Sequence, residues 1–184
     1  EEFVVPKNEK FDIQGLNHLA LVCKDMEKTV EFYSEVLGMP LFKTIELPNN
    51  MGQHFFFDIG KGNSLAFFWF PDAPDSQPGV SHPVSIVGRG PITSAHASMN
   101  HVAFDVPAEK IDEYQKRLED AGVDVTSVVN HDDSERGASP TITDTTFVRS
   151  LYFTDPDGIM LEFAAWTREF DASDVKHEPA KAVE

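Results

Sequence analysis

Two histidines and one glutamate have the residue types and spacing that could bind a metal ion. His18 and His101 each follow an asparagine inside an apolar run. Glu162 is the single carboxylate within the apolar segment 159–166, where burying it unpaired would be costly. Two imidazoles and one carboxylate form a facial triad for a divalent metal, with positions left open for water, substrate or dioxygen. We therefore predict a metal site made by His18, His101 and Glu162.

A structural role in the core is the alternative for each of these side chains. A single histidine in an apolar strand more often bonds to the backbone than to a metal. Two histidines at matched positions after the same residue type make coincidence less probable. When the two halves are aligned, the counterpart of Glu162 is Ala66, so the first half supplies no fourth protein ligand.

The elements that must position these residues form a pattern that occurs twice. A strand, a helix ending before a glycine, and three further strands are predicted in residues 14–70 and again in 99–168. The chain is therefore an internal duplication of a strand–helix–three-strand unit. The predicted helices cover 26–37 and 108–121, and the predicted strands cover 16–23, 41–47, 53–59, 64–70, 99–105, 123–129, 149–153 and 159–166.

Three segments lie outside the repeated units. Residues 1–13 are expected to form an N-terminal arm with one apolar patch, and residues 169–184 an acidic tail. The Pro-rich connection 71–98 has no periodicity and reads either as a solvated linker or as a lid or partner contact. Long loops in compact domains are more often of the second kind.

Composition excludes several classes of protein. With 184 residues, 41% of them hydrophobic and 15 of them Phe, the chain can bury a core as one domain or two fused modules. A net charge of -16 disfavours nucleic acid and anionic membranes as partners. No apolar run approaches the roughly 20 residues that span a bilayer. The one cysteine, Cys23, excludes an internal disulfide and favours the reducing cytoplasm.

These motifs make the chain resemble the vicinal oxygen chelate superfamily. That family includes glyoxalase I, fosfomycin-resistance proteins, methylmalonyl-CoA epimerase and the type I extradiol dioxygenases. The resemblance covers about residues 14–168. It implies an α+β fold in which two paired βαβββ modules form a half-open barrel around one divalent metal, and it implies a homodimer. It rests on Leu-Asn-His-Leu-Ala-Leu, Phe-Tyr-Ser-Glu-Val-Leu-Gly-Met-Pro, Asn-His-Val-Ala-Phe-Asp-Val and Tyr-Phe-Thr-Asp-Pro-Asp-Gly-Ile-Met-Leu-Glu.

Within the superfamily, the details resemble the extradiol branch. The pattern from Tyr152 through Asp-Pro-x-Gly to Glu162 fits those enzymes, in which the tyrosine assists the substrate and the glutamate binds iron. In glyoxalase I, the position of Ala66 would usually carry a fourth ligand. In fosfomycin-resistance proteins a threonine usually stands two residues after the first ligand, where this chain has Ala20.

Two departures weaken the match to the extradiol branch. The acid–base histidine expected directly before Ser64 is replaced by Gly-Asn, and a further histidine expected several residues before Tyr152 is missing. His54 is a candidate substitute base if it points inward, and a surface histidine on an edge strand if it does not. His82, His96, His131 and His177 are expected to be solvated in loops or in the tail.

The resemblance and the residues together lead to one main hypothesis and two rivals. The main hypothesis is a cytoplasmic Fe(II) ring-cleaving dioxygenase that acts on a catechol-like or oxygen-chelating aromatic, with dioxygen as co-substrate. Tyr152 and His54 would be its catalytic residues. The first rival keeps the fold with Mn, Ni, Co or Zn and performs a glyoxalase-like, epimerase or thiol-transferase reaction. The second rival is a metal-free protein that sequesters a ligand.

Overall fold

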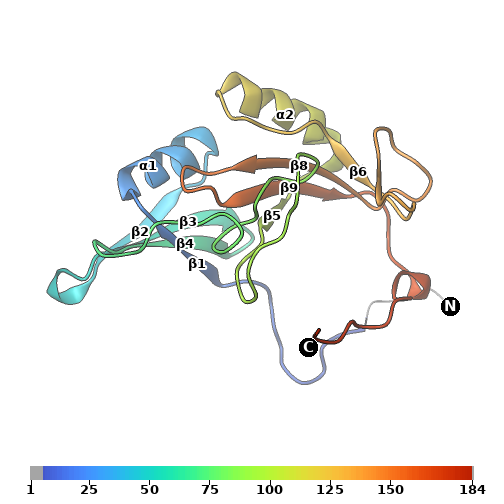
Figure 1. Ribbon diagram of the computed structural model, residues 1–184. Coiled ribbons are helices and arrows are strands. Elements are labelled where there is room, and N and C mark those ends of the chain that lie inside the picture. The colour runs from blue at the N-terminus through green and yellow to red at the C-terminus, as the bar shows by residue number, and fades with distance from the viewer. Residues whose placement is uncertain (1–5, 184) are drawn as a thin grey trace.

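The structure is a computed structural model that describes residues 6–183, so the apolar patch predicted in the N-terminal arm, residues 3–5, lies outside it. Two β-sheets lie next to each other, and the two main helices cover the same side of them (Figure 1). The fold is therefore the α+β arrangement of paired βαβββ modules that the sequence predicts. None of the helices in the described range is long and apolar enough to cross a bilayer.

The first module forms a four-stranded sheet in the order β1-β4-β3-β2, with β1 parallel to β4 and the other pairs antiparallel. Its helix begins at an Asp25 cap, because that carboxylate accepts a hydrogen bond from the amide of Lys28. Gly38, at φ +72°, ends the helix in a conformation that other residues resist. The elements are β1 (His18–Cys23), α1 (Met26–Val30) with a π-helical continuation (Glu31–Val36), β2 (Leu41–Glu46), a 3-10 turn (Pro48–Asn50), β3 (Gln53–Gly60) and β4 (Asn63–Trp69).

The second module repeats this topology in a five-stranded sheet, ordered β5-β9-β8-β6-β7, in which the short β7 is an addition. Its first strand again runs parallel to its last. The elements are β5 (Val102–Asp105), a 3-10 turn (Ala108–Lys110), α2 (Ile111–Asp120), β6 (Val129–His131), β7 (Ala138–Ser139), β8 (Val148–Thr154) and β9 (Met160–Trp166), followed by a 3-10 turn (Ala172–Asp174).

Strand register shows which residues of the two modules are equivalent. In the first sheet Ala66 pairs with Phe56 on one side, and in the second sheet Glu162 pairs with Tyr152 on the corresponding side. On the other side, Ala20 pairs with Ala66 and Ala103 pairs with Glu162. Each of these alanines is two residues after the histidine of its module. The register therefore confirms that Ala66 is the first-half counterpart of Glu162.

Alternation along the strands divides the aromatic side chains between two faces. Phe57 and Phe67 are fully buried on the helix side, where both rings pack against Tyr33. Their neighbours Phe56 and Phe68 share the opposite face of the same sheet with His18. Phe57 and Phe67 therefore belong to the core, whereas Phe56 and Phe68 line the opposite face.

The segment between α2 and β8 differs from its prediction. A strand was expected over 123–129, but the regular strand is only the three residues of β6. Upstream of it, Thr126 lies beside β8 and exchanges hydrogen bonds with the backbone of Tyr152 through both its amide and its hydroxyl. Because the side chain replaces part of the backbone ladder there, no regular pairing forms until residue 129.

The turn between β8 and β9 makes hydrogen bonds to the first module. The hydroxyl of Tyr33, which is fully buried, donates to the carboxylate of Asp155 at 3.0 Å. The amide of Lys24 donates to Asp157 at 3.2 Å. Burial raises the pKa of Asp155 to about 6, although hydrogen bonds from the amide of Ile159 and from Tyr33 oppose that rise. Asp155 is therefore a buried polar contact between the second module and the first, although Pro156 beside it is exposed.

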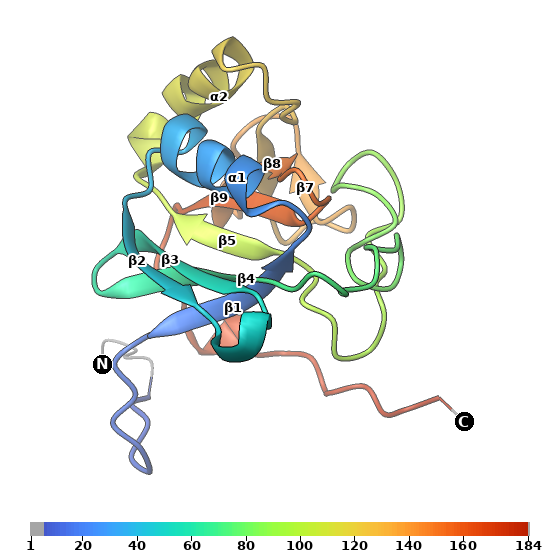
Figure 2. The ribbon, with the colours of Figure 1, turned by 90° about the vertical axis from the view of Figure 1, so that its left-hand side faces the viewer.

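The connection 71–98 packs against the second module. It carries no helix or strand, and Figure 2 shows it as green loops at one edge of the molecule. The guanidinium of Arg89 contacts the Asp124 carboxylate at 2.6 Å and donates to the carbonyl of Val125 at 3.1 Å. His82 lies directly against Gly158, beside a small cavity of about 140 Å³. Because it is anchored at several points, the connection is not a free linker.

Candidate functional site

His101 and Glu162 meet at the start of β5 and the middle of β9. The Nε2 atom of His101 is 3.0 Å from Oε2 of Glu162. Glu162 is 5% exposed, and its second carboxylate oxygen accepts a hydrogen bond from the hydroxyl of Ser150 on β8. The acid predicted to need a cation is therefore buried, with an imidazole nitrogen facing it.

The hydrogen bond on the other side of the His101 ring fixes the role of Nδ1. Oδ1 of Asn100 is 2.8 Å from Nδ1, and the Asn100 amide nitrogen donates elsewhere, to the carbonyl of Ile92. Since an amide oxygen only accepts, Nδ1 carries a hydrogen, and Nε2 is the ring atom that faces Glu162. At this distance the nitrogen and the carboxylate oxygen need a cation between them, either a proton through which His101 donates to Glu162 or a metal ion.

The charge state of Glu162 suits a metal ligand. Burial raises the pKa of this carboxyl, but hydrogen bonds from His101 and Ser150 outweigh burial and hold the pKa below its usual value. The group is therefore ionised at neutral pH, in a place where water cannot compensate its charge. An ionised, buried carboxylate beside an imidazole nitrogen is a pair of donors that a divalent cation can bind once it replaces the proton between them.

Tyr152 lies beside this pair and contacts a histidine that the sequence analysis assigned to solvent. Its hydroxyl is 2.8 Å from Nε2 of His131, which is half-buried in β6. Burial and the charge of Glu162 raise the pKa of Tyr152 well above its usual value, so the hydroxyl stays neutral. The prediction of a solvated loop at His131 is wrong. The signal in the sequence was the alternation from Val129 to His131, which puts both on the face that carries Tyr152.

His18 occupies the matching position in the first sheet, but its surroundings differ. It is exposed, and its Nδ1 is 2.7 Å from Oδ1 of Asn17, which repeats the arrangement of Asn100 and His101. Its ring centroid is 6.4 Å from that of His54 and 5.6 Å from that of Phe56. The first module thus presents an oriented imidazole with no carboxylate facing it.

His54 points to the same face as His18. Its strand β3 lies between β4 and β2, so it is not an edge strand, and the ring stacks on Phe68 at 3.6 Å. Its Nε2 atom is buried and has no hydrogen-bond partner within the described residues. Burial lowers the pKa of His54, and the neighbouring His18 lowers it further. A neutral imidazole with a free nitrogen is thus available on this face.

A single chain does not bring the three predicted metal ligands together. His101 and Glu162 are in contact, whereas His18 belongs to the other sheet. Within residues 6–183, no group of three or more His, Cys, Asp or Glu side chains could hold a metal ion. One copy of the chain therefore presents two of the three donors at one place and the third at another.

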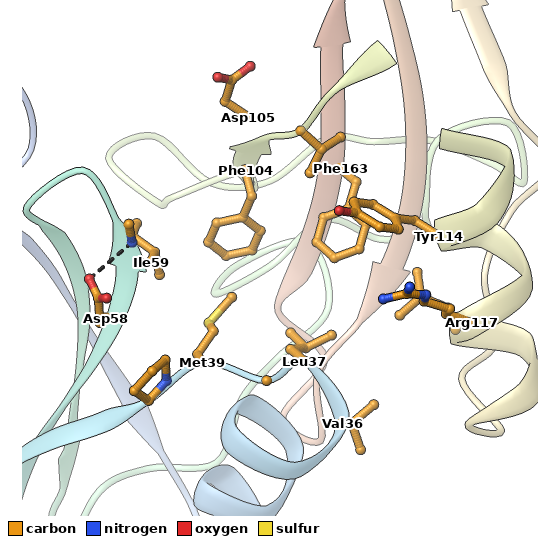
Figure 3. A pocket seen from close by; sticks show the side chains of 15 residues that line it. Val36, Leu37, Met39, Asp58, Ile59, Phe104, Asp105, Tyr114, Arg117 and Phe163 are labelled. Carbon is orange, nitrogen blue, oxygen red and sulfur yellow. Dashed lines mark hydrogen bonds between the residues drawn. The ribbon is translucent and has the colours of Figure 1, made fainter. Parts of the chain in front are cut away.

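A cavity of about 440 Å³ lies elsewhere, where the end of the first helix approaches α2 (Figure 3). The side chains of Met39, Phe104 and Phe163 point into it, and Tyr114 and Arg117 reach it from α2. None of the predicted ligands or catalytic residues lines this cavity. It is a gap in the packing of the two modules on the helix side, opposite the face that carries the histidines.

Comparison with known proteins gives a consistent family assignment. A sequence profile of the Glyoxalase/Bleomycin resistance protein/Dioxygenase superfamily matches residues 15–163. The metallothiol transferase FosB of Lysinibacillus sphaericus is 25% identical, covering 84% of this chain and 84% of that protein. The fosfomycin resistance protein FosX of Listeria monocytogenes is 26% identical, covering 85% and 93%. The putative ring-cleaving dioxygenase MhqE of Bacillus subtilis is 27% identical over 60% of this chain and 32% of its own length.

Solved structures agree on the fold. The glyoxalase family protein from Enterococcus faecalis superposes with a TM-score of 0.59 at 21% identity, covering 84% of this chain and 99% of that one. A structure of a FosX variant from Listeria monocytogenes, complexed with Mn(II) and 1S,2S-dihydroxypropylphosphonic acid, superposes with a TM-score of 0.56 at 22% identity. It covers 84% of this chain and 94% of FosX.

Proposed function

Because the chain belongs to the Glyoxalase/Bleomycin resistance protein/Dioxygenase superfamily, we propose that it is a metal-dependent enzyme that activates a small oxygen-chelating substrate without redox chemistry. The observation that carries the proposal is the pair made by His101 and Glu162. A buried, ionised carboxylate lies 3.0 Å from the Nε2 atom of an imidazole, an arrangement in which a bound metal ion would replace the bridging proton.

A second copy of the chain would supply the third ligand. His18 is exposed on the open face of its sheet, and its Asn17 partner already directs Nε2 away from the backbone. The same face leaves Val22 48% exposed, Phe42 58% and Phe70 36%, an apolar area that a partner would cover. In a twofold dimer, His18 of each subunit would meet His101 and Glu162 of the other, which makes two equivalent sites.

The donor set fits a divalent ion of intermediate hardness. Two imidazole nitrogens and one carboxylate oxygen suit Mn, Fe, Co, Ni and Zn alike, so the ligands alone do not select iron. The FosX structure contains Mn(II), and we propose Mn(II) as the first metal to test in place of the expected Fe(II). When bound, the metal would polarise the substrate oxygens and lower the pKa of a chelated hydroxyl or water.

The residues around the pair favour proton transfer or nucleophilic addition. Tyr152 holds a neutral hydroxyl close to Glu162 and would donate to a substrate oxygen as it gains charge. In the dimer, His54 would stand across the site as a neutral base with a free nitrogen. Phe56 and Phe68 would form an apolar wall next to it.

The substrate proposed here has no strongly anionic group. Arg149, the arginine closest in sequence to Tyr152, bonds to Asn130 and to Asp112 on α2, away from His101. We therefore propose a small molecule with two adjacent oxygens and an apolar body. The compartment proposed for it remains the reducing cytoplasm, since the one cysteine, Cys23, is a free and buried thiol.

A ring-cleaving dioxygenase is the second candidate function. The hydrogen bond between Tyr152 and His131 favours it, because a histidine missing from the expected position is supplied by β6 instead. The partial similarity to MhqE has the same implication. In this alternative the substrate is a catechol-like aromatic, the metal is Fe(II) and dioxygen is consumed.

One set of assays distinguishes the two functions. The purified protein would be loaded separately with Mn(II), Co(II), Ni(II), Zn(II) and Fe(II). Each form would then be tested for thiol or water addition to epoxides, hemithioacetal isomerisation, and oxygen uptake with catechols. We expect turnover without oxygen uptake, which Glu162→Gln abolishes and the exposed control Glu109→Gln preserves. Oxygen uptake that needs Fe(II) would favour the dioxygenase, and an absence of metal binding would refute both functions.

Mixing two inactive variants tests whether the site is shared between subunits. His18→Ala and Glu162→Gln would each lose the metal as homodimers. In a mixed dimer, one of the two sites would contain His18 from one chain and Glu162 from the other, both unchanged. Statistical exchange of subunits should then restore about one quarter of the wild-type metal content. If mixing restores nothing although the subunits exchange, the proposal of a shared site is wrong.

A further inference from the structure

We propose that the cavity of about 440 Å³ on the helix side binds a small carboxylic acid with an apolar body. The acid would lie between the two modules, with its carboxylate at Arg117 of α2. This site is separate from the pair formed by His101 and Glu162. The inference therefore depends neither on a bound metal ion nor on the proposed reaction.

The floor of the cavity is apolar and is built by both modules. Met39 comes from the first module, and Phe104 and Phe163 come from paired positions of β5 and β9 in the second (Figure 3). The volume is within the range of about 300–1,000 Å³ that is usual for small-molecule sites. An apolar ligand that fills this space would remove its lining from water. The remaining apolar side chains of the lining are those of Val36, Leu37, Pro40, Ile59, Val106 and Leu118.

Two polar side chains stand on the α2 side of the cavity. Tyr114 and Arg117 are three residues apart, so both lie on one side of the helix (Figure 3). The guanidinium carbon is 5.6 Å from the centre of the tyrosine ring. Nη2 of Arg117 holds the carboxylate of Glu113, but within residues 6–183 no hydrogen bond joins its Nε or Nη1 atoms, or the Tyr114 hydroxyl, to another group. One edge of the guanidinium and one hydroxyl are therefore available to a ligand.

The charges around the cavity favour a single carboxylate at Arg117. The two acids that also line the cavity are already engaged, since Asp58 accepts from the Gly60 amide at 3.0 Å and Asp105 pairs with Lys61 at 3.6 Å. The net charge of -16 repels anions, so a preference for a carboxylate must come from Arg117 itself. One edge of a guanidinium donates two hydrogen bonds to a carboxylate, whereas it would repel an amine.

Occupation of the cavity would also add a contact between the modules. Its lining comes from segments 36–40 and 58–60 of the first module and from β5, α2 and β9 of the second. Because only the folded chain brings these segments together, a bound acid should raise the unfolding temperature.

The experiment compares octanoate with 1-octanol and octylamine, which have the same chain and differ in charge. Calorimetric titration measures each affinity for the wild type, Arg117→Gln and Lys116→Gln. Lys116 is the neighbouring cation of α2 and is similarly exposed, but it pairs with Asp120 and does not line the cavity, so its variant is the matched control. NMR spectra of the methionine methyl groups locate the ligand. Met39 lines the cavity, whereas Met160 is buried elsewhere in β9, and Met39→Leu identifies the Met39 signal.

The wild type and Lys116→Gln should bind octanoate roughly threefold to tenfold more tightly than 1-octanol, and octylamine most weakly. Arg117→Gln should bind octanoate and 1-octanol about equally. Octanoate should shift the Met39 signal, leave the Met160 signal unchanged and raise the unfolding temperature of the wild type. The proposal is overturned if octanoate does not bind, if the wild type binds 1-octanol equally well, if Arg117→Gln keeps the preference for octanoate, or if the Met39 signal does not move.

Discussion

The two modules share one topology but present different faces at equivalent positions. The second sheet places Glu162, Tyr152 and Ser150 where the first sheet has Ala66, Phe56 and His54. The polar set is buried and its groups bond to one another, whereas the first face is apolar and partly exposed around His18. The duplication has therefore produced complementary halves: one carries the charge and the other the apolar wall.

The turns that follow β3 and β8 differ in the same way. The turn after β8 contacts the first module through a buried hydrogen bond between Asp155 and Tyr33. The turn after β3 is exposed, and its Lys61 makes only a surface ion pair with Asp105 at 3.6 Å. The second module thus contributes both the buried acid of the site and the buried contact between the modules. Each feature of this asymmetry can be tested by making one half resemble the other.

The largest effect is expected from removing the acid that the first half lacks. Glu162→Gln keeps the shape of the side chain but removes the charge, and it should weaken binding of Mn(II) by at least about 100-fold. Calorimetric titration of the metal-free protein measures this. Wild-type affinity in Glu162→Gln would mean that the cation, if any, binds elsewhere.

Placing an acid in the first half should be costly. Ala66 is fully buried, Phe56 stands opposite it, and the position equivalent to Ser150 carries His54 in place of a hydroxyl. We expect Ala66→Glu to lower the free energy of unfolding by about 3 kcal/mol more than the neutral, equally large Ala66→Gln. Urea unfolding of both variants measures the difference. Equal stability of the two would show that the charge is tolerated on this face and that the asymmetry is not one of burial.

The buried turn predicts a pH dependence of stability. Burial raises the pKa of Asp155 to about 6, so this group stabilises the fold when protonated and that stability is lost as the pH rises through 6. When the pH rises from 4.5 to 7.5, the free energy of unfolding of Asp155→Asn should therefore increase by about 2 kcal/mol relative to that of the wild type. Chemical unfolding at several pH values measures the difference.

The control for this prediction is Asp174→Asn. Hydrogen bonds from Arg168 lower the pKa of Asp174 to about 2. The free energy of unfolding of Asp174→Asn should therefore differ from that of the wild type by the same amount throughout this pH interval. If Asp155→Asn also shows a constant difference, the carboxyl of Asp155 is not held in a setting that favours its neutral form.

Much of this asymmetry could be predicted from the sequence. The repeated Asn-His pair, the lone Glu162 and its Ala66 counterpart are visible because each is encoded within one strand. His131 was misplaced because its signal, the alternation from Val129 to His131, is only three residues long and follows a segment that pairs through the side chain of Thr126.

The smallest effect is expected from giving the second half the phenylalanine of the first. Tyr152→Phe reproduces Phe56 and removes the hydroxyl that bonds to His131 at 2.8 Å. The fold should lose only about 1 kcal/mol, because one half-buried hydrogen bond is lost and the ring still fills its place. Turnover should fall by about 10- to 100-fold while Mn(II) affinity stays within a factor of about two, since the hydroxyl would contact the substrate and is not a metal ligand. His131→Phe separates the two partners. If His131 only orients the tyrosine, its replacement should lower turnover less than Tyr152→Phe does, whereas an equal loss would mean that the pair acts as one catalytic unit.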